Sequence, residues 1–380
     1  MHTGYAPLFQ NPENRLPDLE VYRNELRLAE LAEPLGFDSV WSVEHHFTDY
    51  TMCPDVVQFL SWMAARTRRV GLGSMVVVLP WHDPIRAAEQ IAMLDQISGG
   101  RVILGIGRGL GRVEFEGFRI DMGESRGRFV ESATLVLEAL ENGWMEGGGE
   151  YVDQPRRDLR PAPFRSFRGR TFAAAVSPDS MPVMAKLGVG LLVVPQKPWE
   201  DVRKDLEVYR EVFREENGTD APAPLCAGFY FVDESADRAE EMARRYIAGY
   251  YGTVMKHYEF TSGHLAHVKG YEYYAAVDKY IAKRTGEGAA EDFMRLMPWG
   301  TPQQVLEKVE KVHAMIGHAG TMCHFSYTGM PYADAERSMR LFAAKVLPEL
   351  KSMKMSCEPL RVEPLDLPAR PAAVGACASS

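Results

Sequence analysis

Eight short apolar segments, each followed by an amphipathic one, predict an α/β protein with the (β/α)₈ TIM-barrel fold. The apolar segments are Tyr5–Phe9, Ser39–Val43, Val70–Leu79, Val102–Ile106, Phe172–Val176, Leu191–Val194, Leu225–Val232 and Thr321–Ser326. Each has the length of a strand and is apolar on both faces, as in a parallel sheet buried beneath helices. A doubly wound open sheet is the alternative that the same alternation allows.

The intervening segments carry recognisable helix starts. Asp18 opens the first of them, and Asp83 is followed by Pro84, which combines an N-cap residue with a proline in the first turn. Thr301 and Pro302 repeat that combination before the helix expected over 303–316. These signals place helices where a barrel requires them.

Two connections are too long for simple barrel loops, one after the fourth strand and one after the seventh. They are Gly109–Arg170 and Gly252–Met297, and long insertions in a compact domain often serve as lids or binding loops. We therefore expect one barrel domain over residues 1–355. The tail 356–380 is rich in Pro and Ala without periodicity, and we expect it to be mobile or to lie on the surface.

Composition excludes several classes of protein. The chain has 380 residues, 46% of them hydrophobic, and a net charge of −9, which argues against binding a nucleic-acid backbone. No apolar run reaches the length of about 18 residues that a bilayer span needs, and the N-terminus does not read as a signal peptide. The five cysteines form no CxxC pair, so we expect free thiols and a cytoplasmic location.

The second strand ends directly in Glu44, His45 and His46. Active sites of TIM barrels are built at the C-terminal ends of the strands, and an imidazole there can give or take a proton near neutral pH. A buried histidine that only satisfies a hydrogen bond is the alternative. We expect no metal site, because adjacent strand residues face opposite sides and no further ligands follow at helical spacing.

Basic and hydroxyl side chains after the fourth and fifth strands could bind an anion. Arg108 stands among glycines spaced two apart, which is not the GxGxxG pattern of a dinucleotide fold. Ser177 and Ser180 lie where a helix begins, so they either assist phosphate binding or cap the helix. Arg126 opens the inserted helix; a tight turn and solvated arginines are the alternative interpretation.

Together these segments resemble the luciferase-like flavin-dependent monooxygenases, most of all the luciferase α subunits of that family. The resemblance rests on Glu44–Phe47, Leu79–Glu89, Leu94–Arg101, Gly105–Leu110, Ser125–Arg126 and Gly300–Pro302. Their order and spacing match over roughly residues 4–200, whereas residues 200–297 match only in the order of elements.

The resemblance implies a TIM barrel that binds FMN at the C-terminal ends of the strands. By position, His45 matches the histidine that assists proton transfer, and Glu44 the acid beside it, with a structural or hydrogen-bonding role. The other matches concern the cofactor: Met75 and Val76 match a non-proline cis peptide beneath the flavin ring, and Arg108, Arg126, Ser177 and Ser180 match the phosphate-binding set. Gly107 belongs to the same cofactor site.

Two positions depart from the family pattern. Gly107 stands where luciferase has a cysteine, which argues against light emission and a long-lived peroxide. Val176 stands where luciferase has an acid, which affects the detail of the phosphate site.

The predicted function is that of a two-component monooxygenase that uses reduced FMN and O₂ and oxygenates a small organic substrate through a peroxyflavin. A separate flavin reductase would supply the cofactor, because the chain shows no nicotinamide-binding fingerprint. Trp81 and Trp299 hint at an apolar, aromatic or carbonyl substrate, and the family leads us to expect a homodimer.

Two alternatives stay open at this point. A deazaflavin-dependent oxidoreductase of the same superfamily would transfer hydride without oxygen. A non-catalytic flavin-binding protein or β-like partner subunit would keep the barrel, although the presence of His45 weighs against it.

Overall fold

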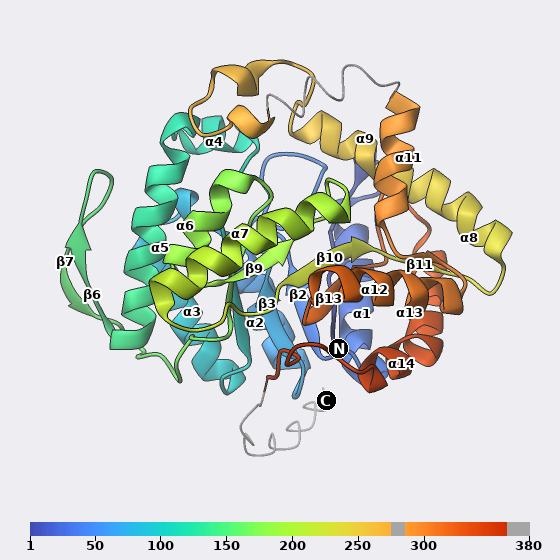
Figure 1. Cartoon of the computed structure of the whole chain (residues 1–380), viewed down its shortest axis with the longest axis horizontal. Coiled ribbons are helices and arrows are strands. Elements are labelled where there is room, and N and C mark those ends of the chain that lie inside the picture. Colours follow the sequence, from blue (N-terminus) through green and yellow to red (C-terminus); the bar gives the residue numbers. More distant parts are fainter. Residues whose placement is uncertain (275–285, 363–380) are drawn as a thin grey trace, which may run out of the picture.

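The computed structural model describes residues 1–274 and 286–362. Its centre is a closed parallel barrel in which the third strand pairs with both the second and the fourth (Figure 1). The eight positions are filled by β1 (His2–Tyr5), β2 (Ser39–Ser42), β3 (Gly71–Ser74) with its continuation β4 (Val77–Val78), β5 (Val102–Gly107), β8 (Thr171–Ala174), β9 (Gly190–Val193), β10 (Leu225–Phe229) and β13 (Gly320–His324). The predicted (β/α)₈ TIM barrel is confirmed.

Helices surround the barrel on its outside (Figure 1). They are α1 (Asp18–Leu35), α2 (Val56–Arg66), α3 (Pro84–Ser98), α5 (Ser125–Asn142), α6 (Met181–Lys186), α7 (Trp199–Asn217), α12 (Pro302–Ile316), α13 (Tyr332–Lys345) and α14 (Leu347–Ser352). The expected starts are confirmed, since Asp83 accepts backbone hydrogen bonds at the start of α3 and Thr301 forms a capping box with Gln304 at the start of α12.

The bounds of three predicted strands were wrong. The first strand is His2–Tyr5 instead of Tyr5–Phe9, because His2 pairs with Gly320 and the later apolar residues pack as a buried loop. The third strand is broken at the Met75–Val76 peptide, which is cis as the resemblance implied. The seventh ends at Phe229, and β11 (Phe231–Val232) leaves the barrel to pair with β12 (Trp299–Gly300).

The segments that follow β5 and β10 carry elements of their own. After β5 come α4 (Arg112–Phe118), the 3₁₀ turn Met122–Glu124, α5 and the hairpin β6 (Trp144–Gly148) and β7 (Asp153–Asp158). After β11 come α8 (Ala236–Met242), a π-helical turn over Ala243–Ile247, α9 (Ala248–His257), the 3₁₀ turn His264–His267 and α11 (Gly286–Leu296). α4, α9 and α11 gather at the same end of the barrel, at the top of Figure 1. Residues 275–285 of the expected lid lie outside the described residues.

The opposite end of the barrel carries the start of the expected tail. Cys357, Leu360 and Val362 pack against the apolar side chains inside the barrel, and the Leu360 carbonyl oxygen lies 2.9 Å from Nδ1 of His2. Residues 363–380 lie outside the described residues. In the described part of the chain, no helix combines the length and the apolar character needed to cross a membrane.

Candidate active site

A cavity of about 630 Å³ lies among the C-terminal ends of the strands and the helices of the second insertion. Its walls include His45 after β2, Met75 and Val76 between β3 and β4, and Arg108 after β5. The insertion contributes aromatic and aliphatic side chains: Tyr250, Tyr251, Val254, Met255, Tyr258, Phe260, Phe293 and Leu296. The cavity is therefore largely apolar, with a small number of polar groups, as ligand sites usually are.

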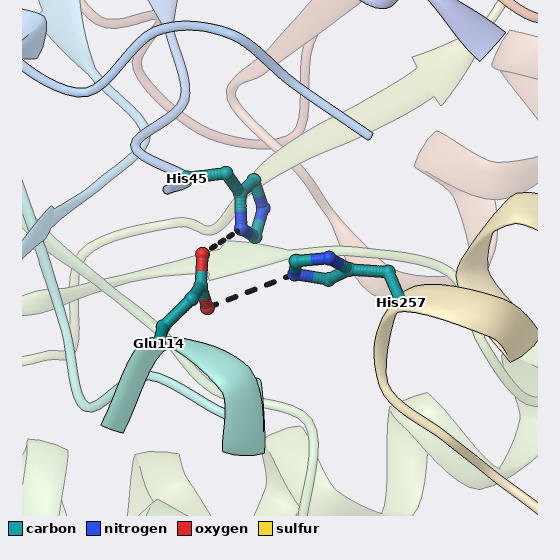
Figure 2. Close-up of side chains that lie close together, drawn as sticks. All are labelled: His45, Glu114 and His257. Atoms are coloured by element: carbon teal, nitrogen blue, oxygen red, sulfur yellow. Dashed lines mark hydrogen bonds and ion pairs between the residues drawn. The ribbon is translucent and has the colours of Figure 1, made fainter. Parts of the chain in front are cut away.

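Three side chains from distant parts of the sequence come together beside this cavity: His45 and Glu114 of α4, which line it, and His257 at the end of α9, which lies behind them (Figure 2). Oε1 of Glu114 lies 2.9 Å from Nδ1 of His45 and also accepts the backbone N–H of His46 at 2.9 Å. Oε2 of Glu114 lies 3.7 Å from Nε2 of His257. The carboxylate thus stands between the two imidazoles.

The electrostatics of the cluster keep its carboxylate ionised. Burial by itself raises the pKa of Glu114, but the charge of His45, its hydrogen bond and the nearby His257 outweigh burial and lower the pKa to about 2. Burial lowers the pKa of His257, which its contact with Glu114 only partly offsets. The ionised Glu114 accepts the Nδ1–H of His45, which fixes the orientation of the ring and leaves Nε2 3.4 Å from the Tyr258 hydroxyl.

The ligand atoms of these three residues lie within 4.8 Å of one another, a spacing that a metal ion could bridge. The 2.9 Å separation of His45 Nδ1 and Glu114 Oε1 is nevertheless that of a charge-assisted hydrogen bond, and a metal would have to displace it. We assign the cluster as hydrogen-bonded and draw no metal chemistry from it.

Glu44 lies beside this cluster but has a different environment. Its Oε2 accepts the backbone N–H of Val78 at 2.8 Å, and its Oε1 lies 2.7 Å from Nε2 of His82 and 3.1 Å from Nε2 of His46. Burial raises its pKa, but these hydrogen bonds outweigh burial, so the pKa is lowered. The buried carboxylate ties the end of β2 to β4 and the turn that follows, which is a structural task.

Two arginines border the cavity on the other side. Arg108 donates to the carbonyl oxygen of Gly270 at 2.8 Å and stacks on the ring of Tyr271, with the guanidinium 4.0 Å from the ring centroid. Arg126 donates to the same carbonyl at 3.4 Å and to that of Asp179 at 3.1 Å. The hydrogen bonds of both guanidinium groups go to neutral backbone carbonyls, which leaves their positive charge available to an anion.

The two predicted hydroxyl residues have unequal positions. Ser180 lines the cavity, whereas Ser177 is buried behind it and lies 2.8 Å from the Ser180 hydroxyl. Ser177 therefore positions Ser180, and the turn Pro178–Ser180 leads into α6.

The floor of the cavity is shaped by the cis peptide Met75–Val76 and by Gly107. A Cβ atom on Gly107 would lie only 2.3 Å from Cγ2 of Val76, so a side chain there would collide with the floor. Because Gly107 has no side chain, nothing projects from the floor at this point, and a flat ring could lie against it.

Sequence reasoning missed Glu114 and His257. The only signal was their location, Glu114 just after the glycine-rich segment and His257 in the aromatic insertion. Of the two tryptophans that hinted at the substrate, Trp81 lines the cavity. The prediction for Trp299 was wrong, because Trp299 does not line the cavity. Its indole N–H donates to the Met294 carbonyl, and its ring contacts the ammonium group of Lys308.

Comparison with known proteins places the chain in a family. The model of the luciferase-like monooxygenases matches residues 1–319, so the chain belongs to that family.

Among curated proteins, the chain is similar to alkanal monooxygenase α chains. It is 26% identical to that of Aliivibrio fischeri over 324 residues, which cover 84% of this chain and 91% of the other. It is 27% identical to that of Photobacterium leiognathi over 87% of this chain and 94% of the other.

Solved structures show the same fold. Monooxygenase RslO1 from Streptomyces bottropensis is 28% identical with a TM-score of 0.73, covering 92% of this chain and all of the other. The oxygenating constituent of 3,6-diketocamphane monooxygenase from Pseudomonas putida, in complex with FMN, is 18% identical with a TM-score of 0.72, covering 95% and 100%. An F420-dependent secondary alcohol dehydrogenase is 18% identical with a TM-score of 0.67, covering 91% and 98%.

Proposed function

We propose that the protein is the oxygenating component of a two-component monooxygenase, which receives reduced FMN and uses O₂ to oxygenate a small organic substrate. The observation that carries this proposal is His45, because its Nδ1 is fixed by an ionised carboxylate while its Nε2 side borders the cavity. A base oriented in this way is what proton transfer during oxygenation needs.

The fold alone does not choose the cofactor, since neighbours of the same fold hold FMN or F420. Within this chain, the smooth floor at Gly107 and the arginine pair fit a flat ring and a phosphate. Arg108, Arg126 and Ser180 would hold the phosphate, and Met75 and Val76 would support the ring. Reduced FMN, when bound, supplies the two electrons with which O₂ is activated.

The protein's own residues supply binding, exclusion of water and proton transfer. Tyr258 and Phe260 of the second insertion cover the cavity beside His45, which keeps bulk water from the reacting centre. Nε2 of His45 accepts or returns a proton at the oxygenated group, while Glu114 stabilises the imidazolium that forms. Glu44 holds the strand end in place and takes no part in the proton transfer.

The lining favours an apolar, aromatic or carbonyl substrate. Trp81, Phe229 and Phe293 offer ring faces. The polar part of the lining includes His45, Arg108 and Arg126 and the further charged side chains Lys197, Glu200, Asp292 and Arg295. A substrate would therefore be held by apolar contact and present its reactive group to His45.

We further propose that a separate reductase delivers the reduced FMN and that the protein forms a homodimer. Trp62 of α2 is 48% exposed, and Met93 and Ile97 of α3, which packs against α2, are 56% and 47% exposed. Exposed large apolar side chains on two neighbouring helices would suit contact with a second copy. We expect Trp62→Arg to convert the dimer into a monomer in sedimentation-velocity measurements. A wild-type monomer at micromolar concentration would contradict this.

The buried free thiols Cys53, Cys226 and Cys323 fit the cytoplasmic location we predict.

Rapid mixing of the protein, loaded with photoreduced FMN, with oxygenated buffer tests the function. We expect a transient absorbance that belongs neither to reduced nor to oxidised flavin, and ¹⁸O from labelled O₂ in the product of a model aldehyde or ketone. Turnover without oxygen, with a reduced deazaflavin only, would favour hydride transfer instead. Reoxidation at the rate of free flavin, unchanged by any substrate, would favour a non-catalytic subunit.

A further inference from the structure

We propose that Glu114 and His257 form a proton path that connects His45 to a second, separate cavity. This inference rests on the proposed function, because it gives the proton handled by His45 a route that avoids the substrate. The route begins at Nε2 of His45, runs through both carboxylate oxygens of Glu114 and ends at His257 (Figure 2).

The path continues beyond the two histidines. Nδ1 of His257 lies 3.1 Å from Oγ1 of Thr48, and Thr48 is only half-buried. Thr48 and His257 both line a cavity of about 490 Å³, together with Asp49, Lys256 and Glu259. Charged side chains of this kind hold water, which can take up a proton that arrives at His257.

The cluster stands in the wall between the two cavities. His45 and Glu114 line the main cavity but not the second one, whereas His257 lines the second cavity and not the main one. Tyr50 lines both cavities and its ring stacks on that of His257, with centroids 4.3 Å apart. The carboxylate of Glu114 is thus the one polar group of the cluster that reaches from the base in the main cavity to the histidine of the second.

Two buried atoms within the described residues lack a hydrogen-bond partner where the path needs one. They are Oε2 of Glu114 and Nε2 of His257, whose side chains are 0% and 1% exposed. Leaving a buried polar atom without a hydrogen bond is energetically unfavourable, so such a pair calls for an explanation. Their separation of 3.7 Å closes to a hydrogen bond with a small side-chain movement once a proton lies between them.

The proton transfer balances without any further reactant. Nε2 of His45 gains a proton from the main cavity, and its Nδ1 passes the original proton to Oε1 of Glu114. A half-turn of the neutral carboxyl exchanges its two equivalent oxygens, and the proton moves to Nε2 of His257. Nδ1 of His257 then releases its proton toward Thr48 and water, and tautomer exchange restores the starting state.

Titratable groups lie at both ends of the path. The hydroxyl oxygen of Tyr258 lies 3.4 Å from Nε2 of His45 on the main-cavity side. On the other side, burial lowers the pKa of His257, and the nearby Glu114 and Asp49 only partly offset this. Asp49 and Glu259 line the second cavity together with Lys256, and their carboxylates can take up a proton that His257 releases.

Histidine ¹⁵N NMR on the flavin-free protein tests the path independently of any oxygenation. In the wild type we expect His45 and His257 to titrate as a coupled pair with two macroscopic steps in each curve. In Glu114→Gln and in His257→Gln, His45 should titrate in a single step. Independent single-step curves for both histidines in the wild type would overturn the proposal.

Turnover measurements give the second readout, with His257→Gln compared with His267→Gln, an exposed histidine of the same insertion. We expect His257→Gln to slow the proton-dependent step about tenfold, to reduce the curvature of the rate against D₂O fraction and to be rescued by added imidazole. His267→Gln should behave as the wild type. Unaltered rate and isotope dependence in His257→Gln would contradict the path.

The two experiments separate this inference from the proposed function. If the wild type fails to oxygenate with reduced FMN, the proposed function is wrong, and the NMR coupling still decides whether the path exists. Zinc or iron bound stoichiometrically to His45, Glu114 and His257 in the purified protein, removed by a chelator, would replace the path with a metal site.

Discussion

Two glutamates, Glu44 and Glu114, each hold two histidines within a few ångströms of the same strand end, yet their environments differ. Glu44 accepts a backbone N–H and two imidazole nitrogens, so both of its oxygens are satisfied. Glu114 has one oxygen with two donors and one that lies 3.7 Å from an imidazole without a hydrogen bond. A satisfied carboxylate rigidifies the structure, whereas a partly satisfied one next to a cavity can exchange protons.

The two consecutive histidines, His45 and His46, differ in the same way as the two glutamates they contact. His45 points its basic atom toward the main cavity, while His46 packs between Phe47, Trp81 and Phe118 and bonds to Glu44. Adjacent residues at a strand end face opposite sides, so one histidine serves chemistry and its neighbour serves the fold.

The largest expected effect comes from His45→Ala measured against His46→Ala. We expect His45→Ala to lower oxygenation by about 10²–10⁴-fold while FMN affinity stays near the wild-type value. His46→Ala should lower stability and leave turnover per folded molecule within a few-fold. Equal losses of turnover in both variants, from rapid-mixing data on folded protein, would abolish the distinction between the two clusters.

The second effect concerns stability in acid. The pKa of Glu114 is about 2 in the folded protein against an ordinary 4.5, so its contribution is fully present above pH 4.5 and is lost as the pH falls toward 2. The shift corresponds to about 3 kcal/mol of unfolding free energy. Burial lowers the pKa of His257, which adds a loss of the same sign below its ordinary 6.5.

Urea unfolding from pH 7 to pH 3 checks this expectation. Glu114→Gln should flatten the acid limb of the stability curve, and the exposed Glu241→Gln should leave it unchanged. An identical acid limb in the wild type and Glu114→Gln would mean that the carboxylate is not held ionised by the histidines.

The third effect concerns the anion site opposite the histidines. We expect Arg108→Ala to weaken FMN binding about 10–100-fold, since a charge-assisted hydrogen bond contributes about 1.5–3 kcal/mol. Riboflavin, which lacks the phosphate, should bind both proteins alike in fluorescence titrations. Arg128→Ala is the matched control, because Arg128 pairs with Glu124 outside the cavity. Equal losses for FMN and riboflavin would assign Arg108 to holding the insertion at Gly270 only.

The smallest effect is that of Glu44→Gln. The amide leaves at least one donor of the network unpaired, and we expect a loss of about 1–2 kcal/mol in unfolding free energy, measured in urea. The dependence of turnover on D₂O should be unchanged, in contrast to Glu114→Gln. A stable Glu44→Gln variant that has lost turnover would move Glu44 into the chemistry.

Patterns in the amino-acid sequence are sufficient to predict the barrel and the parts of the site that lie near strand ends. Alternating apolar and amphipathic segments predict the (β/α)₈ order, and local signals such as Asp83–Pro84 fix helix starts, because both depend on neighbours in the chain. His45, Arg108 and the Met75–Val76 peptide could be found because they follow apolar strands or match family segments.

Which side chains lie together in the site depends on how distant segments pack, and the sequence patterns do not predict this. Glu114 and His257 are 143 positions apart in the sequence, so no local pattern links them. They meet because α4 and α9 cover the same end of the barrel. The fold also brings the Ser177 hydroxyl to that of Ser180 and directs the Trp299 indole to the Met294 carbonyl. Contacts between insertions depend on how long loops close over the barrel, which local propensity does not encode.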